Sequence, residues 1–350
     1  MLQPFKRFLR GQSPRLFKRL LVPVSTACVA AALSVASSIA YSFPDSLETP
    51  AFKSDMAKQS LLLDASRTGE GNRVVVVGER GHILFTDDDG RHWAQANVPV
   101  MSTITATHFV SMQKGWAVGH DAVILKTIDG GKSWVKQYDD VETEVPLLDV
   151  WFQNDRVGIA VGAFGYFIRT EDGGETWNQI ENAIDNEDEF HYNAITMVGG
   201  DTLLMVGEYG TLYRSSDFGA SWENITDRTP YEGSFFGVIG TQSTGTVLAY
   251  GLRGNLYRSH DAGDTWEQVQ SHTEASLVGG AVLDDGSIVI VGGSGVVLKS
   301  YDGGRSFTTR IRKQRESLTA VSPTADGNLV IVGAGGIHVV LPNGTDIDRR

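Results

Sequence analysis

The stretch that decides the fold of this chain reads Gly254-Asn-Leu-Tyr-Arg-Ser-His-Asp-Ala-Gly-Asp-Thr-Trp266. Five related stretches occur elsewhere in the 350 residues, and they end at Trp93, Trp134, Trp177, Trp222 and Phe307. The closing aromatic residues of the six copies are 41, 43, 45, 44 and 41 residues apart. A period of about 43 residues indicates a repeat architecture rather than a conventional enzyme domain.

Each copy predicts a β-hairpin. An apolar run such as Leu212-Tyr213 forms a strand, and Ser/Thr-x-Asp-x-Gly then makes a tight turn in which glycine takes a positive φ and the Asp carboxylate accepts N–H groups. The closing aromatic begins the next strand and packs under the turn or against the neighbouring repeat. This is the Asp-box, or BNR, pattern. We expect a structural role for its six aligned aspartates, which are Asp88, Asp129, Asp172, Asp217, Asp261 and Asp302.

A second element, an apolar strand that ends in glycine, recurs upstream of each Asp box. These strands are Val74–Gly78, Trp116–Gly119, Ile159–Gly162, Leu204–Gly207, Leu248–Gly251 and Ile288–Gly292, and a seventh is Leu329–Gly333. A further apolar run, such as Leu148–Phe152, precedes each of them. Four strands in a unit of about 43 residues are typical of a β-propeller blade.

The length of the chain fits seven such units. The seventh, residues 318–341, has three expected strands and no Asp box, so we expect residues 49–60 to supply its outermost strand and close the ring. Seven units of about 43 residues need about 300 residues, which excludes an eight-bladed ring. The prediction is an all-β, seven-bladed β-propeller with Asp-box repeats, formed as a single domain by residues 43–345.

Residues 1–40 resemble a secretory signal peptide. Six Lys or Arg residues and no acidic residue precede Leu20, and the uncharged, apolar segment from Leu20 to Ala40 ends in small residues. We expect cleavage after Ala40 or Ser42 and a periplasmic or lumen-like location. The alternative is an uncleaved amino-terminal anchor, because the apolar segment is long enough to span a bilayer.

Removal of residues 1–40 would change the chemistry of the chain in two ways. Cys28 is the only cysteine, so the remaining chain would have no disulfide, thiol nucleophile or thiolate metal site; lipidation of Cys28 is a second alternative. The formal net charge would change from −12 to −18, because six positive charges are lost. Such an acidic body disfavours nucleic acid and anionic lipid surfaces as partners.

The combined motif Gly-x-x-Gly-x-Ile/Leu-x-Lys/Arg-Ser/Thr-x-Asp-Gly-Gly-x-Ser/Thr-Trp resembles the repeat of the photosystem II assembly and stability factor family. Gly162–Gly165 and Gly207–Ser215 match it closely. The resemblance implies a non-enzymatic, exported propeller that binds newly made reaction-centre polypeptide or, in non-photosynthetic bacteria, a membrane system such as a transporter. The photosynthetic members share a basic patch for partner contact, whereas Glu181–Glu189 is an acidic run here.

Function is expected on one face of the propeller. Loops between second and third strands share this face with the loops that link blades, and the Asp boxes lie on the other face. The expected partner-binding residues are Arg80, His120, Asp121, Phe164, Glu208, Tyr209, Arg253, Arg312 and Arg315. This mixture of charged and aromatic side chains suits a membrane-complex subunit or another client polypeptide, or a glycan, bound by a monomer without a cofactor.

A glycoside hydrolase of the sialidase type is the alternative function, because such enzymes also use Asp-box propellers. Arg80, Arg253 and Arg315 would bind a substrate carboxylate, and Tyr209 with Glu208 would form the nucleophile pair. Adjacent residues of a strand point to opposite faces, which argues against that pair. We also expect no metal site, since the calcium-like start at Asp87 lacks the later ligands of a calcium loop.

Overall fold

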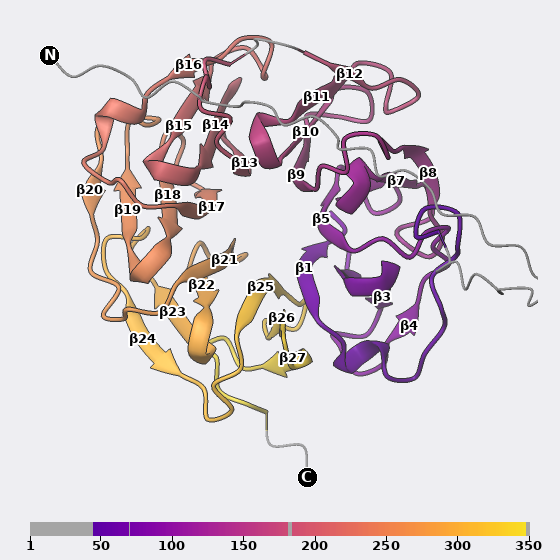
Figure 1. The fold of residues 1–350 in the computed structure, drawn as a ribbon. Coiled ribbons are helices and arrows are strands. Elements are labelled where there is room, and N and C mark those ends of the chain that lie inside the picture. The colour runs from indigo at the N-terminus through magenta and orange to yellow at the C-terminus, as the bar shows by residue number, and fades with distance from the viewer. Residues whose placement is uncertain (1–44, 70, 181–183, 348–350) are drawn as a thin grey trace, which may run out of the picture. The chain divides into compact units, whose positions relative to one another are not determined.

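The computed structural model describes residues 45–69, 71–180 and 184–347, and within them 27 strands form seven antiparallel sheets. The sheets stand side by side in a ring around a centre, as Figure 1 shows. The predicted all-β, seven-bladed propeller is confirmed. The predicted signal peptide lies outside the described residues, and no helix within them is long and apolar enough to cross a membrane.

The strands occupy four positions from the centre outwards. The innermost strands are β1 (Leu62–Arg67), β5 (Ile104–Phe109), β9 (Leu147–Phe152), β13 (Tyr192–Gly199), β17 (Phe235–Gly240), β21 (Leu277–Val282) and β25 (Leu318–Pro323). The second strands are β2 (Val74–Gly78), β6 (Gly115–Gly119), β10 (Gly158–Gly162), β14 (Thr202–Gly207), β18 (Val247–Gly251), β22 (Ile288–Gly292) and β26 (Leu329–Gly333). The third strands are β3 (Ile83–Thr86), β7 (Ile124–Thr127), β11 (Phe167–Thr170), β15 (Leu212–Ser215), β19 (Leu256–Ser259), β23 (Val296–Ser300) and β27 (Gly336–Val340).

Short elements complete the blades. The outermost strands are β4 (Ala94–Gln95), β8 (Val135–Tyr138), β12 (Asn178–Gln179), β16 (Glu223–Asn224), β20 (Glu267–Gln268) and β24 (Thr308–Ile311). One-turn 3₁₀ helices join second to third strands at η2 (Glu79–Gly81), η3 (His120–Ala122), η4 (Ala163–Gly165), η5 (Glu208–Gly210), η7 (Leu252–Gly254) and η8 (Gly293–Gly295). Two others are η1 (Ala57–Gln59) and η6 (Thr226–Arg228).

The hydrophobic core lies between neighbouring blades. The second strand of the first blade is covered on both faces: Val75 and Val77 pack against the second blade, whereas Val74 and Val76 pack against the seventh. Side chains of a strand alternate between the two faces of its sheet, so a strand covered on both faces needs apolar residues throughout. Each blade therefore shares a core with both neighbours.

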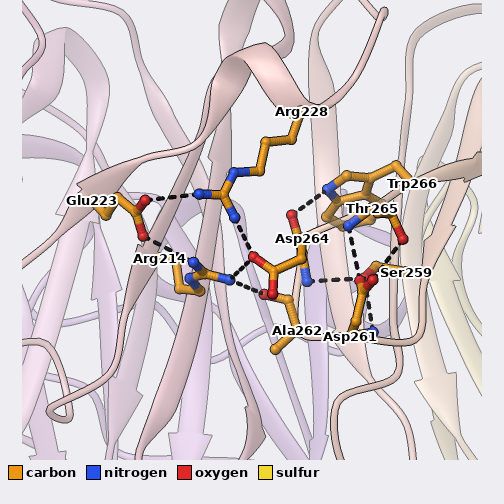
Figure 2. A network of polar contacts seen from close by, with 10 residues as sticks. Arg214, Glu223, Arg228, Ser259, Asp261, Ala262, Asp264, Thr265 and Trp266 are labelled. Atoms are coloured by element: carbon orange, nitrogen blue, oxygen red, sulfur yellow. Dashed lines mark hydrogen bonds and ion pairs between the residues drawn. The ribbon is translucent and has the colours of Figure 1, made fainter.

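The Asp boxes are held by hydrogen bonds within each turn, as Figure 2 shows for the fifth blade. The carboxylate of Asp261 accepts the Ser259 hydroxyl (2.7 Å) and the N–H and hydroxyl of Thr265 (2.9 and 2.6 Å). Partial burial opposes ionisation, but these donors outweigh it and lower the pKa of Asp261 to about 2. Each of the other five box aspartates likewise accepts the hydroxyl of the Ser or Thr two residues before it.

In three blades the basic residue of the repeat links its blade to the next one. Lys126 Nζ donates to the Gly173 carbonyl (2.9 Å), and Arg258 Nε donates to the Gly303 carbonyl (2.9 Å). Arg214 reaches Ala262 in the same way (3.3 Å; Figure 2). In each of these three cases the acceptor directly follows the box aspartate of the next blade, so a basic residue at this position can join two blades.

The expected fourth strand of the last blade is corrected by the structure. The sheet β25–β26–β27 has three strands, and residues 45–61 form none. Carbonyl groups of the first blade take up the donors of this segment: Ala51 N–H bonds to Val98, and Lys53 Nζ bonds to Gln95 and Ala96. The first part of the segment therefore follows the first blade, whereas η1 packs against β27 without forming a fourth strand.

The ring closes through its innermost strands and one Asp-box side chain. The Thr319 hydroxyl of the seventh blade donates to the Leu62 carbonyl of the first (2.7 Å). Asp89, next to the first box aspartate, accepts the N–H groups of Ala325 and Asp326 (2.9 and 3.3 Å). These side-chain contacts hold the first and last blades together.

Candidate functional site

The candidate site is the surface formed by the turns η2, η3, η4, η5, η7 and η8, which we call the η-turn face. Two glycines shape five of the six turns, whereas η3 has Ala122 at the second position, and η7 shows the role of the glycines. A Cβ at Gly251 would lie 2.1 Å from the Ser234 carbonyl oxygen. Gly254 has φ +72°, and a Cβ there would lie 2.0 Å from the Thr273 carbonyl oxygen. Close backbone approach and a positive φ thus require the Gly-x-x-Gly pattern.

A left-handed residue that is not glycine precedes the second glycine position of each turn. Its φ lies between 51° and 59° at Arg80, Asp121, Phe164, Tyr209, Arg253 and Ser294. Such a conformation is costly for residues with a side chain, and costly conformations concentrate at functional sites. Five of the expected partner-binding residues therefore occupy one equivalent position, where the framework is constant and the side chain varies.

Aromatic side chains gather where the third and fourth blades meet. Phe164 and Tyr209 are 60% and 64% exposed, so both rings present much of their surface to solvent. The Phe164 ring lies 4.9 Å from the His191 ring, and the Tyr209 ring lies 4.8 Å from the Phe190 ring. Glu208 accepts the His191 N–H (3.2 Å), which fixes the blade-linking segment to η5. We call these four rings with residues 184–189 the blade 3–4 patch.

The acidic part of the patch is an ordered loop. Asn186 holds it by donating to the Phe190 carbonyl (2.9 Å) and accepting the Phe190 N–H (3.0 Å). The exposed carboxylates are Asp185, Glu187, Asp188 and Glu189. No Lys, Arg or His among the described residues forms an ion pair with any of the four, so their negative charge faces solvent.

A cavity of about 540 Å³ lies beside the aromatic rings. Its walls include Phe164, Ile180, Ile184, Asp185 and Tyr192. The sequence pattern did not identify Phe190 as part of this region. The available signal was that an aromatic residue ends the acidic run directly before the innermost strand of the fourth blade.

The remaining expected residues are not gathered with the patch. Arg80, His120, Arg253 and Arg315 are exposed at other blades. Asp121 accepts the hydroxyl groups of Ser102 and Ser46 (2.9 and 3.3 Å), and so holds the amino-terminal segment.

Arg312 is the clearest correction among these residues. It is 3% exposed and pairs with Asp346 (2.6 Å), and its Nε and Nη1 have no hydrogen-bond partner among the described residues. A side chain this deeply buried supports the structure and cannot offer a docking charge.

The geometry does not assemble the hydrolase alternative. A cavity of about 410 Å³ is lined by Arg253, but not by Arg80 or Arg315. Glu208 bonds to His191, on the linking segment, and no hydrogen bond joins it to Tyr209 in the described part of the chain. The three arginines and the nucleophile pair are therefore not brought to one pocket.

Comparisons with known proteins agree on this architecture. A structure of YCF48 bound to D1 peptide is 18% identical, covers 80% of this chain and 92% of its own, and has a TM-score of 0.64. YCF48 from Cyanidioschyzon merolae is 19% identical, with 80% and 94% coverage and a TM-score of 0.61. A streptogramin B lyase is 12% identical, with 80% and 93% coverage and a TM-score of 0.66. Because the identity is so low, this similarity shows only that the fold is shared.

At the level of sequence, no curated protein matches this chain. The model of the family described as photosynthesis system II assembly factor YCF48 matches residues 46–139 and 135–336. These two matches cover nearly all of the propeller. The chain therefore belongs to the photosynthesis system II assembly factor YCF48 family.

Proposed function

We propose that this protein is a non-catalytic binding factor that holds a segment of a client polypeptide at the blade 3–4 patch. The observation that carries the proposal is the pair of exposed aromatic side chains, Phe164 and Tyr209, held on left-handed turns beside an acidic loop. Exposed aromatic groups on a rigid framework are frequent anchors of protein interfaces. Membership of the assembly-factor family and the fold shared with YCF48 bound to D1 peptide support a polypeptide client.

The charge of the patch indicates the client segment. Four exposed carboxylates without cationic partners attract Lys and Arg side chains, and the adjacent rings can accept apolar or cationic groups. The client is therefore a basic segment with apolar residues, carried by a subunit of a membrane complex such as a transporter or a photosystem. The protein acts outside the cytoplasm as a monomeric assembly or accessory factor, consistent with the expected signal sequence.

Co-purification from the native source tests this function. The tagged, full-length chain is cross-linked mildly, extracted with detergent, and compared with a Phe164→Ala/Tyr209→Ala double variant. Both side chains are mostly exposed, so the variant should fold normally. Ser294→Ala is the matched control, because Ser294 occupies the equivalent turn position in the sixth blade.

The expected result is a membrane subunit that is recovered with the wild type and the control but is lost with the double variant. Recovery should also fall as salt is increased, since exposed charges are screened. Equal recovery with all three proteins would place the client elsewhere, and recovery of no specific protein would refute the assembly role.

A further inference from the structure

The innermost strands of all seven blades, which surround the centre of the ring in Figure 1, contribute residues to a channel of about 620 Å³. Its lining includes four titratable side chains: Asp64 on β1, His108 on β5, Asp149 on β9 and Tyr250 on β18. Burial lowers the pKa of His108 to about 4, so this ring is neutral at physiological pH. The other three side chains lie at the same height along the channel.

Strand pairing shows that they share one level of the channel. Asp64 pairs with Val77, Asp149 with Val161, and Gly237 with Tyr250. Each of the three pairs lies one residue before the glycine that ends the second strand and leads into the η-turn. The three polar side chains thus form a ring close to the η-turn face.

Tyr250 is an exception in the repeat. The equivalent residue is valine in the other six blades, namely Val77, Val118, Val161, Val206, Val291 and Val332. Two glycines leave space for the larger ring: a Cβ on Gly237 would lie 2.4 Å from it, and a Cβ on Gly280 would lie 2.8 Å from its hydroxyl oxygen. Tyr250 is 2% exposed and lines the channel. Its hydroxyl has no hydrogen bond to any residue that the structure describes.

The two carboxylates also lack a cationic partner. Asp64 accepts the N–H and hydroxyl of Thr107 (2.8 and 2.9 Å). Asp149 accepts the N–H groups of Val150 and Ile195 (both 2.8 Å). No Lys or Arg is among the residues described as lining the channel. Burial raises the pKa of both acids, and that of Asp149 reaches about 7 with a contribution from the charge of Asp64. Each carboxylate keeps free lone pairs for a further donor.

We propose that the channel binds a primary ammonium group on an aliphatic chain, with the ammonium between Asp64, Asp149 and the Tyr250 hydroxyl. The three N–H donors of an ammonium group match these three oxygen-bearing side chains. Leu63, Phe236 and Val278 line the same channel and provide apolar surface for the chain. A metal ion fits less well, because the described residues contain no cluster of three acidic, His or Cys ligands.

Two sources could supply this group: a free alkylamine or the lysine side chain of a polypeptide. The full-length protein is therefore titrated at pH 8 with n-butylammonium chloride and, separately, with the peptide acetyl-Gly-Lys-Gly-amide. Binding is measured by isothermal titration calorimetry, and n-butanol is the uncharged control. The variants are Asp149→Asn and Tyr250→Phe, which keep the shapes of the side chains, and Asp227→Asn serves as the matched control on the exposed surface.

The expected dissociation constant of n-butylammonium is on the order of 1 mM, without measurable binding of n-butanol. Asp149→Asn should weaken ammonium binding at least tenfold and Tyr250→Phe severalfold, while Asp227→Asn leaves it unchanged. Equal far-ultraviolet circular dichroism spectra and a single cooperative thermal unfolding transition would show that the variants are folded. Binding of the peptide as well would assign the site to a lysine side chain, and binding of n-butylammonium alone would assign it to a small amine. The proposal is overturned if neither probe binds, or if both channel variants bind like the wild type.

Discussion

Replacement of Arg258 by Met should weaken the contact between the fifth and sixth blades and so lower the stability of the protein. Arg258 is buried on β19 of the fifth blade, and its Nε donates to the Gly303 carbonyl of the sixth blade at 2.9 Å. Its Nη1 pairs with Glu267 at 2.9 Å. Methionine keeps much of the aliphatic packing of arginine but removes both polar contacts.

The expected loss follows from these two contacts. Removal of a hydrogen bond from a charged donor costs about 1.5–3 kcal/mol when the acceptor is left without a partner. The pair with Glu267 adds little, because that carboxylate is 61% exposed and its charge is screened by water. We therefore expect Arg258→Met to lower the free energy of unfolding by about 2 kcal/mol, or the melting temperature by roughly 3 °C for a domain of this size.

Arg169→Met is the matched control. Arg169 has the same motif position in the third blade, but it pairs only with Glu171 of its own blade, a carboxylate that is 71% exposed. Its Nε is buried without a hydrogen-bond partner among the described residues. Its replacement should therefore change the free energy of unfolding by less than about 0.5 kcal/mol. Urea unfolding followed by tryptophan fluorescence measures both variants, and equal losses would refute the proposed link between blades.

Three further changes test the turns and the channel. Asp261→Asn should cost about 1 kcal/mol at pH 7, because the ionised form accepts the turn donors. The folded pKa of Asp261 is about 2, below the ordinary value of 3.8 for an aspartate, so this contribution is present above pH 4 and is lost as pH falls through 2. Unfolding at a series of pH values would show this loss. Gly254→Ala should cost more than about 2 kcal/mol, because φ is +72° and the new Cβ meets the Thr273 carbonyl. Gly200→Ala should cost about 1 kcal/mol in the same denaturant assay, because no atom lies within 4 Å of the new Cβ. Asp149→Asn should flatten the dependence of stability on pH. The folded pKa of Asp149 is raised to about 7, so the wild type loses stability as pH rises from about 4 through 7. A thermal-denaturation profile against pH that is the same for variant and wild type would contradict this prediction.

The fold could be predicted because its information is local and repeated. The spacing of the Asp boxes predicts the blades, and continuous apolar runs such as Val74–Val77 predict strands buried on both faces. The η-turn residues could be placed for the same reason, since the Gly-x-x-Gly pattern recurs in register. Partners outside the repeat could not be found in this way, and the amino-terminal segment illustrates this. Counting strands predicted a fourth strand on the seventh blade, whereas the segment bonds to the first blade and reaches β27 only with the turn η1.

Most of the contacts that could not be predicted from the sequence involve residues that depart from the repeat. Arg312 was expected among the partner-binding residues, yet it is buried and pairs with Asp346. Tyr250 follows the pattern of a buried apolar strand, and only the distant glycines Gly237 and Gly280 let its hydroxyl reach the channel. Such contacts join residues far apart in sequence, so they depend on the closed ring and not on the period of the motif.

Site-specific photo-cross-linking at position 209 tests the central claim most directly. A photoreactive phenylalanine analogue would replace Tyr209 in the full-length chain, and the same analogue at Ser294 would probe the equivalent turn of the sixth blade. After illumination in the native source, we expect a membrane-complex subunit to be attached at position 209 and not at position 294. Attachment of the same subunit at both positions, or of no protein at position 209, would contradict binding at the blade 3–4 patch.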